Sequence, residues 1–206
     1  MKLLHIDSSI TGSDSITRRL SRDIVAQQQA AHADLQVSYL DLAEQAPHPL
    51  SMDALGFRMA AQDDTLSETQ RQENAVSEAL VSQLIDSDIV VIGAPMYNFT
   101  IPAQLKSWLD RVAQAGRTFK YTENGPVGLL GDKTIILALS RGGIYSANPA
   151  MEHQESYLRS IFGFMGVSDI RVVLAEGVNM GSDHRERGLA QAQADIRALD
   201  PTAVAA

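Results

Sequence analysis

The 206-residue chain contains no cysteine, and aromatic residues make up only 5% of it. The absence of cysteine excludes disulfide bonds, cysteine-ligated metal centres and thiol catalysis within the chain. No apolar run approaches the roughly 20 residues that cross a bilayer. Met1 leads straight into a short strand pattern, without the apolar core and cleavage site of a signal peptide. We therefore expect a cytoplasmic protein without a membrane anchor.

Positive charge is also scarce. The chain has 17 Lys and Arg against 25 Asp and Glu, which gives a formal net charge of -8. No basic block stands out, so neither nucleic acid nor an anionic membrane is an expected partner. With 45% hydrophobic and 20% charged residues, the composition is that of an ordinary globular protein. The length predicts a single domain over residues 1–206 with a sizeable core.

Short apolar runs alternate with amphipathic helical patterns along the chain. Strands are predicted at 3–6, 35–39, 89–92, 134–139 and 170–175, and helices over about 15–33, beyond 101, and around 189–199. This alternation predicts an α/β fold with a doubly wound, five-stranded parallel sheet and helices on both faces. A polar, helical insertion is expected at about 47–84, and an aromatic-bearing loop at 119–126.

Several familiar nucleotide and catalytic motifs are missing. No G-x-G-x-x-G follows the first strand, which disfavours a Rossmann-type pyrophosphate site, and the Gly-Asp-Lys-Thr at 131–134 leads into a strand instead of a P-loop helix. There is no G-x-S-x-G elbow, and the five histidines are not spaced as metal ligands. No side chain stands out as a nucleophile or general base, so we predict that the chemistry resides in a cofactor.

The turn after the first strand is rich in hydroxyls. Residues 8–17 hold six serine and threonine side chains immediately before a predicted helix. A helix N-terminus offers free N–H groups and a partial positive charge, so this turn can hold a phosphate without Lys or Arg. The alternative is an ordinary polar loop with one N-cap residue. Its place after the first strand favours the phosphate of a mononucleotide.

Two further turns follow predicted strands. Residues 96–99 carry a thioether, a phenol, an amide and a phenyl ring, a mixture that suits a flat, partly polar heterocycle. The glycine pair at 142–143 permits positive φ and close approach of the backbone to a ligand, although an ordinary turn is equally expected. Because these turns share the carboxyl edge of the predicted sheet, they favour a flavin mononucleotide with glycine amides near its pyrimidine side.

Five segments together resemble the FMN-dependent NADH azoreductases, also called FMN-dependent NADH:quinone oxidoreductases. They are 94–99 (Ala-Pro-Met-Tyr-Asn-Phe), 117–126, 140–143, 162–166 and 175–177, which occur in family order and cover almost the whole chain. The resemblance implies a flavodoxin-like fold, tightly but non-covalently bound FMN, and NADH as electron donor. It also implies a homodimer with two FMN sites at the subunit interface.

The resemblance assigns the cofactor site residue by residue and names no catalytic side chain. The FMN phosphate is assigned to Ser9, Ser15, Ile16 and Thr17, the ribityl chain and ring to Met96, Tyr97, Asn98 and Phe99, and the other side of the ring to Ser140, Arg141, Gly142 and Gly143. Tyr121 and Phe164 correspond to aromatic residues on the substrate side. The loop after Gly143 departs from the family pattern, so we expect Tyr145 to shape the mouth of the substrate pocket.

The implied activity is hydride transfer from NADH through FMN to quinones, together with reductive cleavage of aromatic azo compounds. We expect ping-pong kinetics because the donor and a planar aromatic acceptor would occupy one pocket in turn. One alternative is a flavodoxin-type electron carrier, which would need neither the insertion nor the aromatic segment around Tyr121. Another is a reductase of the same fold that acts on nitroaromatics, chromate or free flavin. No residue decides between NADH and NADPH.

Overall fold

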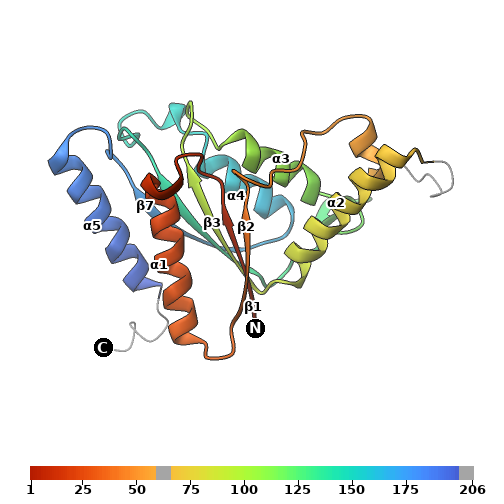
Figure 1. The fold of residues 1–206 in the computed structure, drawn as a ribbon, viewed down its shortest axis with the longest axis horizontal. Helices are drawn as coiled ribbons and strands as arrows, with labels where there is room; N and C mark the ends of the chain where they lie inside the picture. The colour runs from red at the N-terminus through yellow and green to blue at the C-terminus, as the bar shows by residue number, and fades with distance from the viewer. Residues whose placement is uncertain (59–65, 200–206) are drawn as a thin grey trace.

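The computed structural model describes residues 1–58 and 66–199, and its centre is a parallel sheet. The strands are β1 (Lys2–Asp7), β2 (Gln36–Asp41), β3 (Ile89–Pro95), β6 (Thr134–Ser140) and β7 (Asp169–Ala175). They lie in the order β2-β1-β3-β6-β7, and every neighbouring pair is parallel (Figure 1). The predicted doubly wound five-stranded sheet is therefore confirmed.

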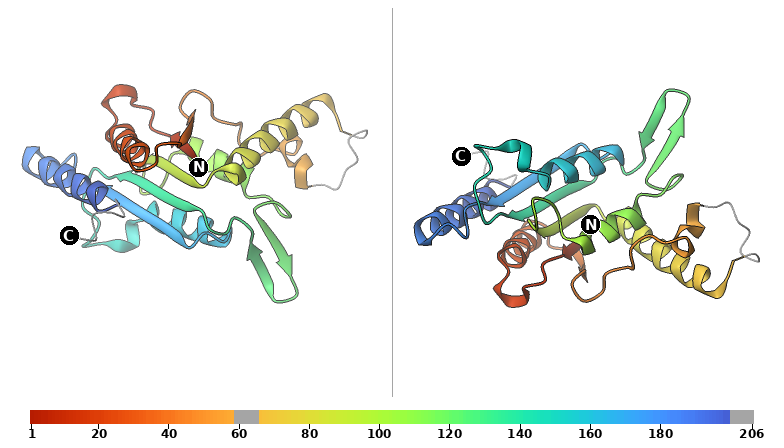
Figure 2. Two further views of the ribbon diagram at one scale, coloured as in Figure 1. Left: turned by 90° about the horizontal axis from the view of Figure 1, so that it is seen from below. Right: turned by 90° about the horizontal axis from the view of Figure 1, so that it is seen from above.

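Helices cover both faces of this sheet. α1 (Ile16–Ala31) and α5 (Ser182–Ala198) pack on one face, as the views in Figure 2 also show. α2 (Glu68–Asp86), α3 (Ala103–Val112) and α4 (Glu155–Phe164) pack on the other face. Short 3-10 helices occupy Gly12–Asp14, Asp53–Arg58 and Pro149–Met151. None of the helices in these two ranges is long and apolar enough to span a bilayer.

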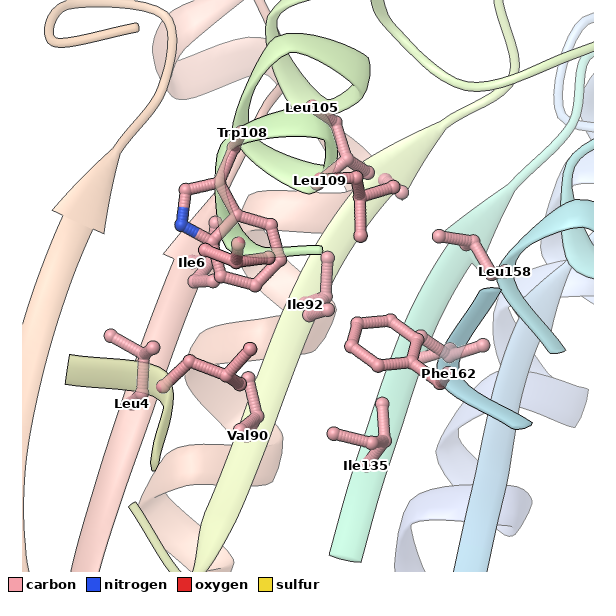
Figure 3. Close-up of a cluster of buried hydrophobic side chains, with 14 of the residues drawn as sticks. Leu4, Ile6, Val90, Ile92, Leu105, Trp108, Leu109, Ile135, Leu158 and Phe162 are labelled. Atoms are coloured by element: carbon pink, nitrogen blue, oxygen red, sulfur yellow. The ribbon is translucent and has the colours of Figure 1, made fainter. Parts of the chain in front are cut away.

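The core lies in two layers, because successive residues of each strand point to opposite faces. Leu4 and Ile6 of β1 face α3 and α4, where Trp108 and Phe162 are fully buried against them and their neighbours (Figure 3). Leu3 of β1 belongs to the opposite layer, under α1 and α5. Burial on both faces explains why β1, β3 and β6 read as nearly continuous apolar runs.

Two segments differ from the sequence-based expectation. Residues 119–126 are not a loop but most of an antiparallel hairpin, formed by β4 (Phe119–Thr122) and β5 (Gly125–Gly128). The hairpin closes through a two-residue turn whose following Gly125 has a φ of 104°. α4 was not predicted either, although Leu158 and Phe162 have helical spacing and are fully buried.

The segment expected as a helical insertion at 47–84 contains a 3-10 helix and most of α2. Part of it, residues 59–65, lies outside the described residues. α2 begins with a capping box in which Ser67 and Gln70 bond each other's backbone, so its start is fixed locally. This helix carries the chain from β2 at the sheet edge to β3 at its centre.

Candidate functional site

The turns after β1, β3 and β6 meet at the carboxyl edge of the sheet. The N–H of Met96 donates to the carbonyl of Ser140 at 2.8 Å, which fastens the turn after β3 to the turn after β6. Ser8 joins the turn after β1 to β3, because its N–H and its hydroxyl both donate to the carbonyl of Gly93, at 3.1 and 2.8 Å. The three predicted cofactor segments are thus adjacent, at the edge where open α/β sheets bind ligands.

The hydroxyl-rich turn is built around the first turn of α1. Ser15 is the N-cap residue, and its side chain accepts the N–H of Arg18 at 3.2 Å and lies 3.1 Å from the hydroxyl of Thr17. Ser9 lies 3.0 Å from the hydroxyl of Thr11. The N–H groups of Ile16 and Thr17 belong to the first helical turn, where the helix itself supplies no acceptor. These donors and hydroxyls suit a phosphate group.

Arg18 is the residue at this turn that sequence reasoning missed. Its guanidinium pairs with both carboxylate oxygens of Asp41, at 2.6 and 2.7 Å, and donates to the carbonyl of Ser9 at 2.8 and 3.2 Å. The ion pair holds the pKa of Asp41 below its ordinary value. Burial beside Asp7 and Asp41 raises the pKa of the neighbouring Tyr39 to about 12, so its hydroxyl stays protonated. The positive charge of Arg18 is therefore matched by acidic residues of the chain itself.

The turn after β3 has an unusual backbone. Asn98 and Phe99 have φ values of 47° and 73°, and the flanking Tyr97 and Thr100 exchange two hydrogen bonds of 2.9 and 3.1 Å. Two successive left-handed residues are the signature of a type I′ turn. Phenylalanine enters this conformation at a cost of about 1–2 kcal/mol, because its Cβ approaches the following carbonyl. Strain of this kind gathers at ligand sites, and the turn leaves the ring of Phe99 42% exposed.

Tyr97 and Phe99 connect this turn to its neighbours. The Tyr97 hydroxyl lies 3.4 Å from the Ser9 hydroxyl and accepts the N–H of Ile10 at 3.3 Å. The ring of Phe99 meets the ring of Tyr145 edge to face, with centroids 6.3 Å apart. Tyr145 therefore lies beside the predicted cofactor segments. A groove of about 550 Å³ borders Tyr97 and Asn98 on the α3 side.

The segment after β6 behaves differently from its prediction. Arg141 is 5% exposed, and its guanidinium binds Gln154 at 3.0 Å, Glu176 at 2.9 Å and Glu155 at 3.3 Å. This side chain thus anchors α4 and the end of β7. The backbone N–H of Arg141 donates to the carbonyl of Ala175, and its carbonyl accepts the N–H of Val178. Because both the side chain and the backbone of Arg141 are engaged, we expect the residues that follow it to supply the ligand contacts of this segment.

The positive φ predicted for the glycine pair is wrong, because neither Gly142 nor Gly143 has it. A Cβ on Gly142 would lie 2.9 Å from the side-chain nitrogen of Asn179, so that side chain would have to shift. The carbonyls of Gly142 and Gly143 accept N–H groups of the loop after β7, at 3.1 and 3.0 Å. In a trans peptide the next N–H points the opposite way, so the N–H groups of Gly143 and Ile144 face away from that loop.

Tyr121 and Phe164 form a second, separate aromatic group. Phe119 lies between them, with ring centroids 5.5 Å from Tyr121 and 4.6 Å from Phe164. This group lies at the carboxyl end of α4, whereas the start of α4 is near Phe99, whose carbonyl accepts the N–H of His153 at 2.9 Å. The two ends of α4 are roughly 14 Å apart at 1.5 Å per residue. Within one chain, the three predicted substrate residues are therefore not together.

The chemistry of the carboxyl edge fits FMN. Hydroxyls lie at Ser9, Ser15 and Thr17, with the first N–H groups of α1 beside them. The mixed polar and aromatic turn at 96–99 comes next, and outward backbone amides follow at 143–144. FMN carries its phosphate, its ribityl chain and its isoalloxazine ring in the same order along the molecule. The three candidate segments are therefore compatible with the binding of FMN.

Comparison with known proteins agrees with this chemistry. Residues 1–199 match the family model of the flavodoxin-like fold. The chain is 62% identical over 200 residues to an FMN-dependent NADH:quinone oxidoreductase of Polaromonas naphthalenivorans, covering 96% of this chain and 92% of that protein. It is 57% identical over 201 residues to the protein of the same name from Acidovorax ebreus, covering 96% and 93%.

Solved structures agree as well. The crystal structure of an azoreductase from Bacillus anthracis str. Sterne superposes with a TM-score of 0.88 and is 33% identical, covering 96% of this chain and 98% of that one. The structure of azoreductase AzrA is 32% identical with the same TM-score and coverage.

Proposed function

The chain belongs to the family of FMN-dependent NADH:quinone oxidoreductases and azoreductases with a flavodoxin-like fold, and we propose that it reduces quinones with NADH by means of FMN. The observation that carries this proposal is the joining of three donor-bearing turns at one sheet edge, through Met96–Ser140 and Ser8–Gly93 hydrogen bonds. When bound, FMN supplies the two-electron chemistry, by accepting a hydride from NADH and passing it on to the acceptor.

The residues of the chain bind and orient the cofactor in this proposal. Ser9, Ser15, Ile16 and Thr17 hold the phosphate, residues 96–99 line the ribityl chain and ring, and residues 140–143 border the ring from the next turn. In the last segment we assign the contact to the backbone, because the Arg141 side chain is occupied by Gln154 and acidic residues. The outward N–H groups at Gly143 and Ile144 would stabilise negative charge that develops on the ring during reduction.

We further propose that the working form is a homodimer with its sites at the subunit interface. The hairpin β4–β5 supports a dimer, because it projects away from the main sheet (Figure 2) and leaves Tyr121 74% exposed. Tyr121 and Phe164 lie at the opposite end of α4 from Phe99, roughly 14 Å along the helix axis. In a dimer they would instead cover the site of the partner, next to its Tyr145.

The acceptors we propose are planar aromatic molecules, namely quinones and azo compounds. Flat rings suit a pocket bordered by Phe99, Tyr145 and, from the other subunit, Tyr121. NADH and the acceptor would occupy this pocket in turn, so initial-rate plots against both substrates should give parallel lines. Intersecting lines would refute the single-pocket scheme. Dependence on NADH is consistent with a cytoplasmic protein.

The decisive experiment is turnover by the purified protein reconstituted with FMN. With NADH and benzoquinone as the only substrates, we expect steady NADH oxidation and bleaching of the flavin bands when the quinone is left out. A flavodoxin-type carrier would bind FMN but show no turnover without a partner protein. Failure to bind FMN would overturn the proposed function itself. An azo dye, a nitroaromatic, chromate and free flavin, tested as the acceptor in place of quinone, would rank the related activities.

A further inference from the structure

Arg18 is engaged through all of its donors. Its side chain is 17% exposed, and its guanidinium makes five hydrogen bonds to protein oxygens. Two go to the carbonyl of Ser9, two to the carboxylate of Asp41 and one, of 3.0 Å, to the hydroxyl of Tyr39. Arginine has five N–H donors, so none is left for a bound phosphate. Arg18 therefore cannot act there as a direct phosphate ligand in this arrangement.

The contact with Ser9 nevertheless controls where other donors point. The Ser9 carbonyl faces Arg18, so the N–H of Ile10, on the same trans peptide, faces the opposite side. There it meets the hydroxyl of Tyr97 at 3.3 Å, which also lies 3.4 Å from the Ser9 hydroxyl. The Ile10 N–H and the Ser9 hydroxyl thus both point to the side where the turn after β3 lies. Releasing the Ser9 carbonyl would free the peptide to rotate.

Only a planar fork can hold this carbonyl in place. Asp41 fixes the plane of the guanidinium by a bidentate pair from the neighbouring strand. Tyr39 is itself fixed, because its hydroxyl donates to the buried carboxylate of Asp7 at 3.2 Å. A lysine ammonium would keep the charge but, as a point charge with three donors, would not reproduce two bonds to Ser9 and two to Asp41.

We propose that Arg18 is a positioning residue for the FMN phosphate, which orients the Ser9–Ile10 peptide through the Ser9 carbonyl and contributes by geometry, not by charge. The proposal rests on the proposed function, since it concerns the phosphate end of the same site. A positive charge near a phosphate site is usually assumed both to attract the phosphate and to orient the groups around it, and the proposal gives Arg18 only the second role.

The test compares FMN with riboflavin, which has the same ring and ribityl chain but no phosphate. For R18K we expect the Kd of FMN to rise about tenfold or more, the scale of one lost charge-assisted hydrogen bond, and the Kd of riboflavin to stay within about twofold. The 31P resonance of bound FMN should shift while its visible bands do not. D41N keeps Arg18 but holds the plane of its guanidinium less firmly, so it should also raise the Kd of FMN. This variant replaces R18K in the test if R18K does not fold.

Arg22 provides the matched control, because it is an exposed arginine one turn further along α1. If charge alone attracted the phosphate, R22Q would weaken FMN binding and R18K would not; we expect the reverse. Equal losses for FMN and riboflavin in R18K would mean that Arg18 is merely structural, and wild-type affinity in R18K and D41N would also overturn the proposal. If the wild-type protein bound no FMN, the proposed function would fail instead.

Discussion

Gly128 at the end of the β4–β5 hairpin is predicted to be irreplaceable even by alanine. A Cβ built on Gly128 would lie 2.1 Å from the nitrogen and 2.3 Å from the Cα of Gly166, and 2.2 Å from the carbonyl carbon of Met165. Ordinary contacts of a Cβ begin near 3.4 Å, so the two backbones must separate by more than 1 Å. Neither can relax by a side-chain rotation, because all three neighbouring atoms belong to the backbone.

We expect G128A to lower the free energy of unfolding by about 2–4 kcal/mol, the upper range for overpacked cores. The measurement is urea unfolding at one fixed protein concentration, since a dimer makes the midpoint depend on concentration. G163A is the matched control: Gly163 lies in α4, and a Cβ there meets nothing within 4 Å. That change should stabilise the protein by about 0.5–1 kcal/mol, because alanine favours the helix.

The pair of variants also tests the role of the hairpin. Moving β5 away from Gly166 moves Tyr121 with it, so G128A should lose quinone turnover more than it loses FMN affinity. Equal unfolding midpoints for G128A and the wild type would refute the packing argument. Wild-type turnover in a destabilised G128A would refute the assignment of Tyr121 to the substrate pocket, while leaving the packing argument intact.

Three further changes have expected outcomes. Y121S should lower quinone turnover and weaken the dimer in light scattering without changing FMN affinity. R111M should lower the free energy of unfolding by about 3–5 kcal/mol, because it leaves Glu73 without its fully buried arginine partner. The double variant R111M/E73L should lose less free energy of unfolding than R111M when both are measured in urea titrations. Arg18 depresses the pKa of Asp41 in the folded state, so the stability from this pair is present above the ordinary Asp pKa and lost as pH falls through the depressed value. D41N should therefore flatten the acid side of a stability–pH profile.

The sheet was predictable from the sequence, and so was the meeting of the three candidate cofactor turns at one edge. β1, β3 and β6 are buried on both faces, so their apolar runs stand out without any knowledge of their neighbours. Once strands alternate with helices, topology alone brings the turns that follow them to one edge. The position of residues 96–99 beside Ser9 and Ser140 follows from that rule and not from any single motif.

The rest depended on contacts between distant segments. In β4 only Phe119 is buried, so the hairpin shows no alternation of apolar and polar residues. Its one local sequence signal is the turn-forming pair Asn124-Gly125. The Arg18–Asp41 pair exists because β2 lies beside β1, which residue spacing does not reveal. Positive φ was expected at Gly142 and Gly143, where it is absent, whereas the turn after β3 has it at Asn98 and Phe99. Propensity disfavours left-handed backbone at phenylalanine, and at Phe99 the tertiary structure overrides this preference.

The distance along α4 between Phe99 and the hairpin aromatics has a genetic consequence. If Tyr121 serves the partner's flavin, each working site is assembled from two chains that make different contributions. A chain defective at Gly142 and a chain defective at Tyr121 would then complement each other, because every mixed dimer regains one intact site and concentrates both defects in the other. Recovery of turnover by two inactive variants only after co-expression would show that each site contains residues of both chains.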